Sequence, residues 1–138
     1  MLILSLNVWG FGGAPKKLAL KDLFRIVKPD IIFLQETMVD HVKAKDCFLK
    51  LCPTWSCVAV DAIGSSGGLL TGWNPVKGSF EASSVGCGIL LEGKFFGLTH
   101  TLNLLNVYGP YKGRIQFWND ACYTLNSHAC SSCLSVVT

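Results

Sequence analysis

The sequence predicts an α/β fold built around a parallel pair of strands. Two short apolar runs, Met1–Asn7 and Asp30–Glu36, have the length and composition of buried strands. The segment between them has the apolar spacing of a helix that begins at Pro15 and ends before Pro29. A strand, a helix and a second strand in this order form a crossover unit, which makes the two strands parallel neighbours.

Polar side chains stand where each of these strands stops. Asn7 ends the first run, and Glu36 ends the second. Because parallel strands finish at the same edge of a sheet, the two side chains are expected to lie together there. A carboxylate and an amide oxygen are suitable ligands for Mg²⁺. Two simpler interpretations stay open: Asn7 only turns the chain before Gly10, and Glu36 is a helix cap or a solvated strand end.

The remaining chain alternates between further expected elements. We expect a helix at residues 40–51, strands at 55–60 and 69–73, an antiparallel meander from Gly78 to Tyr108, and a helix from Gly113 to about Leu125. Gly64–Gly68 is expected to be an irregular loop, and it lacks the Lys-Ser/Thr ending of a phosphate-binding P-loop. No clear element is expected after the last helix.

Length and composition indicate one folded domain. Of the 138 residues, 50% are hydrophobic and only 15% are charged, which excludes a disordered chain. The net charge of +3 permits an anionic partner but is too small to indicate nucleic acid by itself. No apolar run approaches the roughly 18 to 20 residues of a membrane-spanning helix. The first strand also lacks the features of a signal peptide, so an intracellular chain is expected.

The seven cysteines are odd in number and scattered, which makes a disulfide framework improbable. One cluster near the end can be written as a zinc site, because Cys130 and Cys133 have CxxC spacing and Cys122 and His128 precede them. The first two ligands of that set are irregularly spaced. A loose tail without metal is therefore the favoured interpretation of this segment.

Four stretches, taken in order, resemble the endonuclease/exonuclease/phosphatase superfamily, and in particular the endonuclease domain of plant-type LINE retrotransposon proteins. They are Leu4–Gly10, Pro29–Thr37, Ser66–Leu70 and Asn106–Pro110. Each motif is weak alone, whereas the ordered set is specific. The resemblance covers residues 1–118, and residues 119–138 form a divergent tail that we expect to be disordered.

The resemblance implies the N-terminal part of a four-layer α/β sandwich, with mixed sheets and flanking helices. It also implies a phosphodiesterase that depends on Mg²⁺ or Mn²⁺ and cleaves DNA in the nucleus. In that family the residues matching Asn7 and Glu36 hold the metal, and the tyrosine matching Tyr108 lies beside the scissile phosphate. A metal there neutralises phosphate charge, and a phenol donates a hydrogen bond to it.

The sequence also departs from the family pattern. The Gly-Asp-Phe-Asn and Asp-His motifs that complete the catalytic machinery are absent, and after Tyr108 only Asp120 and His128 offer an acid and a histidine. Leu6, Trp9 and Tyr111 also replace the usual residues.

The expectation is therefore a truncated endonuclease domain that is inactive alone and binds metal weakly. The alternatives are a non-catalytic retroelement relic or interaction module, and another phosphodiesterase or phosphatase of the superfamily. The Asn106-Val-Tyr108 stretch disfavours the phosphatases, which have Asn-x-His there.

Overall fold

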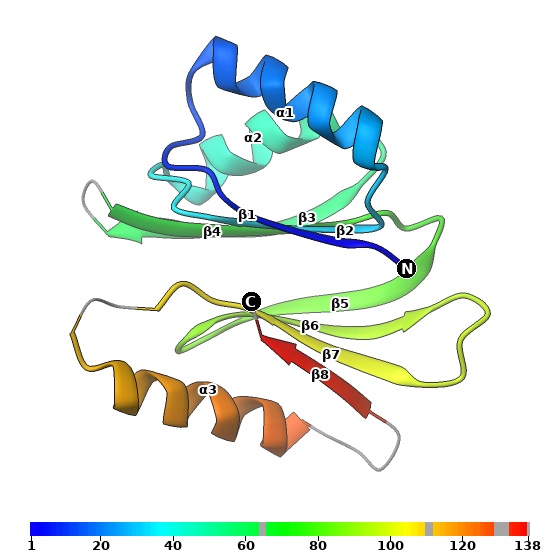
Figure 1. Ribbon diagram of the computed structural model, residues 1–138, viewed down its shortest axis with the longest axis vertical. Helices are drawn as coiled ribbons and strands as arrows, with labels where there is room; N and C mark the ends of the chain where they lie inside the picture. Colours follow the sequence, from blue (N-terminus) through cyan, green and yellow to red (C-terminus); the bar gives the residue numbers. More distant parts are fainter. Residues whose placement is uncertain (64–65, 110–111, 129–132, 138) are drawn as a thin grey trace.

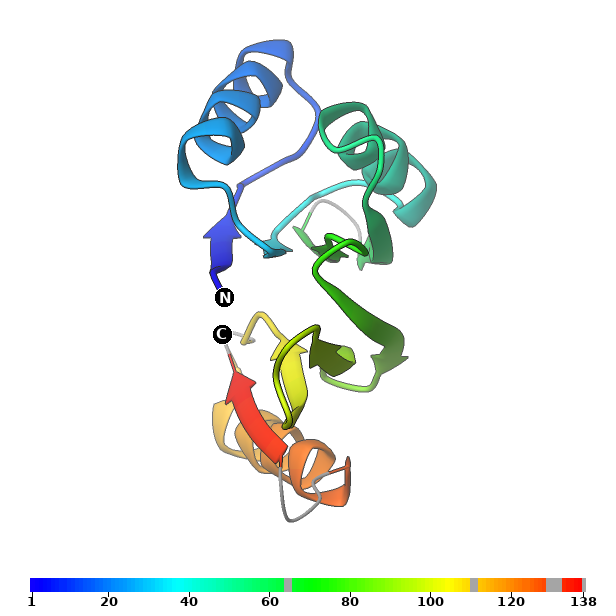
Figure 2. The same cartoon turned by 90° about the vertical axis from the view of Figure 1, so that its right-hand side faces the viewer.

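The computed structural model describes residues 1–63, 66–109, 112–128 and 133–137, which form four layers. Two four-stranded sheets lie face to face (Figure 1). Helices α1 and α2 cover the outer face of the first sheet, and α3 covers the outer face of the second (Figures 1 and 2). The predicted α/β sandwich, with mixed sheets and flanking helices, is therefore confirmed.

The elements of each layer have the following bounds. The helices are α1 (Ala14–Val27), α2 (His41–Leu51) and α3 (Arg114–His128). The first sheet, called sheet A, has the order β1 (Ile3–Asn7), β2 (Ile31–Gln35), β4 (Ser66–Trp73) and β3 (Ser56–Ile63). The second, sheet B, has the order β5 (Gly78–Val85), β6 (Gly88–Phe95), β7 (Thr101–Asn106) and β8 (Cys133–Val137).

The β1–α1–β2 unit is the expected crossover. Strands β1 and β2 pair in parallel, and Asn7 lies opposite Gln35. Helix α1 has a proline in its first turn, where the missing N–H removes no helical hydrogen bond. It ends at Lys28, which adopts a left-handed conformation with φ 51° and donates its N–H to Phe24 O. This short return places the end of β2 directly beside the end of β1.

Strand β2 is buried on both faces, as its continuous apolar sequence predicts. Ile32 and Leu34 face the helices and pack with Phe48 of α2. On the other face, Ile31 and Phe33 pack between the sheets, in a cluster that includes Leu91, Phe95, Leu102 and Leu104 of sheet B. The predicted site at the end of β2 therefore follows a strand whose residues are all buried.

Sheet B is an antiparallel meander from β5 to β7, as predicted. The expectation of no element after the last helix was wrong. Helix α3 continues to His128, and β8 then pairs in parallel with β7. Strand β7, helix α3 and strand β8 thus form a second crossover unit with parallel strands. The Ser- and Cys-rich sequence before β8 gives no clear strand pattern.

The glycine-rich stretch also differs from its prediction in part. Ser66, Gly67 and Gly68 belong to β4 rather than to an irregular loop, while Gly64 and Ser65 lie outside the described residues. Gly68 has φ +87°, and a Cβ there would collide with Thr37 Oγ1. Glycine is thus required where β4 passes the residue that follows Glu36.

Within the described ranges, no helix is long and apolar enough to span a bilayer. The cysteines whose side chains are described, Cys47, Cys52, Cys57, Cys87 and Cys122, are free thiols.

Candidate active site

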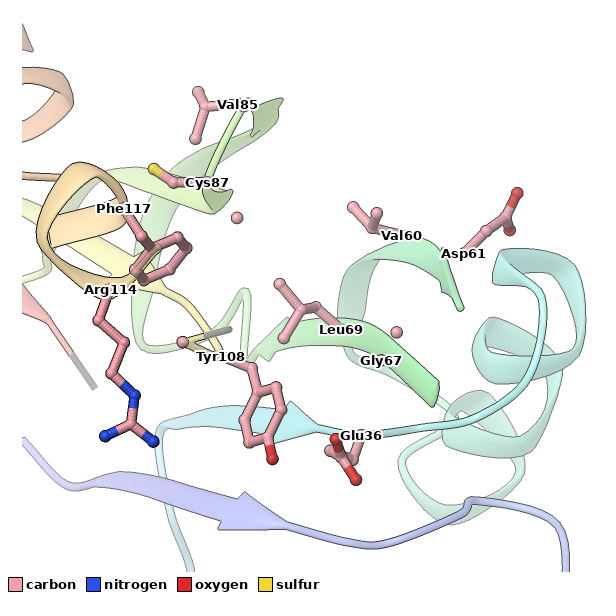
Figure 3. Close-up of a pocket in the computed structure, with 14 residues that line it drawn as sticks. Glu36, Val60, Asp61, Gly67, Leu69, Val85, Cys87, Tyr108, Arg114 and Phe117 are labelled. Atoms are coloured by element: carbon pink, nitrogen blue, oxygen red, sulfur yellow. The ribbon is translucent and has the colours of Figure 1, made fainter. Parts of the chain in front are cut away.

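Glu36 and Tyr108 meet at the edge of the two sheets (Figure 3). Glu36 follows β2, is 8% exposed and has a positive φ of 55°. Tyr108 lies two residues beyond β7 and is 46% exposed. Its hydroxyl donates a hydrogen bond to the Glu36 carboxylate, which raises the pKa of Tyr108, and the negative charge of Glu36 adds to this effect. The side chains that follow β2 of sheet A and β7 of sheet B thus contact each other.

Asn7 ends β1 next to this pair. Its side chain is exposed, and its Oδ1 accepts a hydrogen bond from Trp9 N at 3.1 Å. Because an amide oxygen has two lone pairs, this turn leaves Oδ1 with a second acceptor position. Trp9 is 73% exposed, and its carbonyl accepts a hydrogen bond from Lys16 Nζ at 2.6 Å. Asn7 therefore turns the chain, as the simpler interpretation expected, and also presents oxygen at the strand end.

Backbone hydrogen bonds hold Glu36 in place from both neighbouring strands. Gly10 N donates to Glu36 O at 2.7 Å on the β1 side. On the β4 side, Thr37 N donates to Gly68 O at 3.2 Å. Thr37 is fully buried, and its Oγ1 has no hydrogen-bond partner among the described residues. These contacts sustain the positive φ of Glu36, a conformation that is strained for a residue with a side chain.

A buried amide bridge joins the two sheets beneath the site. Gln35 Nε2 donates to Asn106 Oδ1 at 2.8 Å and to Ser5 Oγ at 3.0 Å. Asn106 Nδ2 donates to Leu70 O at 2.9 Å and to Thr71 Oγ1 at 3.2 Å. Gln35 immediately precedes Glu36, and Asn106 lies two residues before Tyr108. The bridge therefore fixes the two strands whose ends carry the site.

The contact between Glu36 and Tyr108 forms one side of an open cleft with a volume of about 600 Å³ (Figure 3). Two further charged residues line it, Arg114 at the start of α3 and Asp61 of β3. The charge of Arg114 acts on Tyr108 and opposes the rise of its pKa. The cleft thus places a cation, two carboxylates and a phenol within one concave surface.

Asp61 is tied to the start of α2. Its Oδ1 accepts a hydrogen bond from His41 N at 2.6 Å, and His41 Nδ1 lies 2.6 Å from the same oxygen. These hydrogen bonds, the backbone one first, hold the pKa of Asp61 below its usual value. Both side chains are exposed, so this pair shapes the rim of the cleft and contributes little to stability.

The oxygen atoms at the ends of β1 and β2 supply some of the ligands that a hard cation needs. Glu36 supplies a carboxylate and Asn7 an amide oxygen, and Mg²⁺ accepts one or two such protein ligands while keeping water and substrate phosphate. The part of the chain that the structure describes has no group of three or more His, Cys, Asp or Glu side chains that could hold a metal. Any ion here would therefore depend on solvent and substrate for most of its ligands.

Of the three predicted residues, Glu36 and Tyr108 line one cleft, whereas Asn7 ends the neighbouring strand β1 and does not line that cleft. The sequence interpretation missed Arg114 and the Gln35–Asn106 bridge. The Gly-Arg step that opens α3 was a usable signal for a cation near Tyr108, whereas the bridge depends on how two sheets face each other. Of the zinc candidates, Cys130 and the side chains of His128 and Cys133 lie outside the described residues, and Cys122 is exposed.

We expect Glu36→Gln to lower the pKa of Tyr108 toward the ordinary value of about 10. Loss of the carboxylate removes the charge that disfavours the phenolate and replaces a charged acceptor by a weaker neutral amide. Because the folded-state pKa is raised, this contact stabilises the fold below the unfolded pKa and is lost as pH rises through the folded pKa. NMR titration of ¹³Cζ-labelled tyrosine in metal-free buffer measures the pKa of Tyr108. An unchanged Tyr108 pKa in Glu36→Gln would contradict the contact.

Several solved structures are similar to this chain in fold. A D. rerio TDP2 humanized by 14 mutations matches with a TM-score of 0.74 at 14% identity, covering 99% of this chain and 60% of that chain. The AP endonuclease LMAP from Leishmania major matches with a TM-score of 0.69 at 19% identity, covering 98% and 54%. The 3′ phosphatase NExo from Neisseria, bound to a product DNA hairpin, matches with a TM-score of 0.66 at 16% identity, covering 99% and 56%.

These matches show the fold. The chain shares the two-sheet α/β fold of these proteins and spans less than two thirds of the length of each structure named. No protein-family model matches the sequence, and no curated protein matches it.

Proposed function

We propose that this chain is part of a metal-dependent phosphodiesterase of the endonuclease/exonuclease/phosphatase type that acts on DNA. The observation that carries the proposal is the convergence of Glu36 and Tyr108 from different sheets, beside Asn7 at the end of the neighbouring strand. The DNA bound to the Neisseria phosphatase supports DNA as the substrate. The Asn106-Val-Tyr-Gly-Pro110 stretch supports the endonuclease branch of plant-type LINE proteins.

In this function each residue has a defined task. Glu36 and Asn7 would hold Mg²⁺ or Mn²⁺ through oxygen, and the bound ion would neutralise phosphate charge. Tyr108 would redirect its hydroxyl from Glu36 to a phosphate oxygen and donate a hydrogen bond to the charge that develops there. The rigid backbone around Glu36 keeps the carboxylate in position before substrate arrives.

The motifs that activate water in this family are not found in this sequence. Neither a Gly-Asp-Phe-Asn motif nor an Asp-His pair is present. Asp120 lies on α3, where its Oδ1 accepts a hydrogen bond from Gln116 Nε2 at 2.8 Å, and it does not line the cleft. General acid and base groups typically contribute about 10²- to 10⁴-fold to rate. We therefore propose that the isolated chain is inactive, and the same lack supports a second candidate, a non-catalytic relic or interaction module.

Metal binding separates these two candidates. Titration of Mn²⁺ followed by electron paramagnetic resonance is expected to show one weak site, and Glu36→Gln is expected to weaken it roughly tenfold, because the only carboxylate ligand is lost. Asp46→Asn is the matched control, since it removes the same charge on α2, where Asp46 pairs with Lys50. Equal Mn²⁺ affinity in the Glu36 and Asp46 variants would reject the metal site and favour the non-catalytic module.

A further inference from the structure

The cleft has an apolar half that the chemistry proposed above does not use. Val85, Cys87 and Phe117 line the part of the cavity away from Glu36, and Leu69 lies between them and the edge with Glu36 and Tyr108 (Figure 3). These residues come from β4, the β5–β6 hairpin and α3. The cleft therefore has a charged and hydrogen-bonding edge and, beside it, an apolar wall with one aromatic ring. A ligand that fits both has an anionic end and a flat apolar body.

Arg114 and Phe117 connect these two halves. They are three residues apart on α3, so their side chains project from the same face of the helix. Arg114 extends toward the edge where Tyr108 lies, and Phe117 points into the cavity (Figure 3). Arginine stays charged at any physiological pH, and its planar fork of donors matches phosphate oxygens. One helix face thus presents a hydrogen-bond donor for phosphate and an aromatic ring to the same cleft.

The ring of Phe117 is held in place before any ligand binds. It packs partly buried against the cluster of Leu90, Leu105 and Ala121 between sheet B and α3. Its centroid also lies 5.2 Å from that of Trp118 in an edge-on arrangement. An aromatic side chain that is already ordered loses little entropy on binding, which favours stacking against a nucleobase.

We propose that this cleft binds one unstacked nucleotide, with its phosphate on Arg114 and Tyr108 and its base against Phe117, Leu69 and Val85. The inference rests on the proposed function and specifies its substrate as DNA with an unpaired nucleotide rather than a continuous duplex. The volume of about 600 Å³ lies within the usual range for small-molecule sites. A base in a paired stack has both faces covered and cannot reach the wall of a concave pocket. Arg114 also offsets the repulsion between the phosphate and Glu36.

The test measures binding of the whole chain to fluorescein-labelled DNA by fluorescence anisotropy in EDTA, so that neither metal nor cleavage contributes. Three probes of equal length are compared: a fully paired duplex, a duplex with one unpaired nucleotide, and a single strand. We expect the duplex with the unpaired nucleotide and the single strand to bind roughly tenfold more tightly than the paired duplex, because only they can place a base on Phe117.

Matched variants identify the residues responsible. Arg114→Gln is expected to weaken binding of the unpaired probes roughly tenfold and to reduce the salt dependence by about one phosphate contact. Arg25→Gln removes the same charge from the exposed face of α1 and is expected to have little effect. Phe117→Leu keeps an apolar side chain in the α3 cluster and is expected to weaken binding about fivefold. Tyr123→Leu removes an exposed aromatic ring of α3 outside the cleft and serves as its control.

The outcomes distinguish this inference from the proposed function. Equal binding of all three probes, no binding of any probe, or equal losses in the cleft and control variants would overturn the nucleotide site, even if Mn²⁺ binding depends on Glu36. Preference for the unpaired probes that is lost in Arg114→Gln and Phe117→Leu supports the site. If the same preference is found but Mn²⁺ binding does not depend on Glu36, the nucleotide site is supported and the metal-dependent function is rejected. Circular dichroism confirms that each variant is folded.

Discussion

Asn106→Ala is expected to lower the free energy of unfolding by about 3 kcal/mol. Asn106 is fully buried and connects Gln35, Leu70 and Thr71 across the two sheets. Alanine leaves a cavity and removes the partners of several polar groups that water cannot reach. Urea denaturation followed by circular dichroism measures the change. The exposed Asn126 on α3 provides the control, because Asn126→Ala is expected to change stability by less than about 0.5 kcal/mol.

The hydrogen bond between Gln35 and Asn106 can be tested separately from the cavity that Asn106→Ala leaves. Gln35→Met combined with Asn106→Leu replaces both amides by apolar groups of similar size, and such exchanges are much less destabilising than removal of one partner. We expect the double variant to be at least about 1 kcal/mol more stable than the sum of the two single effects predicts. Additive single effects, or a loss below about 1 kcal/mol in Asn106→Ala, would show that the bridge contributes little.

The second large effect concerns catalysis in a fusion that supplies the motifs not found in this sequence. If the chain is joined in register to the second half of a plant-type LINE endonuclease domain, Glu36→Ala is expected to reduce plasmid nicking by about 10²-fold or more. A bound metal supplies several kcal/mol of transition-state stabilisation, and each 1.36 kcal/mol corresponds to about tenfold in rate. Asp46→Ala, on the far side of sheet A, is the control. Nicking that survives Glu36→Ala would remove Glu36 from the metal site.

Sequence patterns predicted the part of the fold that depends on local order. Two apolar runs around a helix sufficed to predict the parallel pair, and the crossover rule then placed Asn7 beside the end of β2. Glu36 was predicted as a site residue because it stands where a strand buried on both faces stops. Its contact with Tyr108 required the superfamily resemblance, because the two residues belong to different sheets.

The remaining features depend on long-range packing. Asn106 is one polar residue in an apolar strand, and only the facing of two sheets places its amide 2.8 Å from Gln35. Arg114 is the first residue of α3, and its approach to Tyr108 follows from how α3 lies on sheet B. Strand β8 is a short run after a Ser- and Cys-rich segment, and it becomes regular only by pairing with β7. Tertiary context overrides local propensity at each of these positions.

Nicking of supercoiled plasmid by the isolated chain tests the central claim most directly. In the proposed function, Asn7 and Glu36 hold the metal, Tyr108 donates to the phosphate, and the groups that activate water are not found in this sequence. We therefore expect no nicking by the purified chain with Mg²⁺ or Mn²⁺, and nicking once the second half is supplied in register. Nicking by the isolated chain that disappears in Glu36→Ala would contradict the account, because this chain would then contain its own means of activating water.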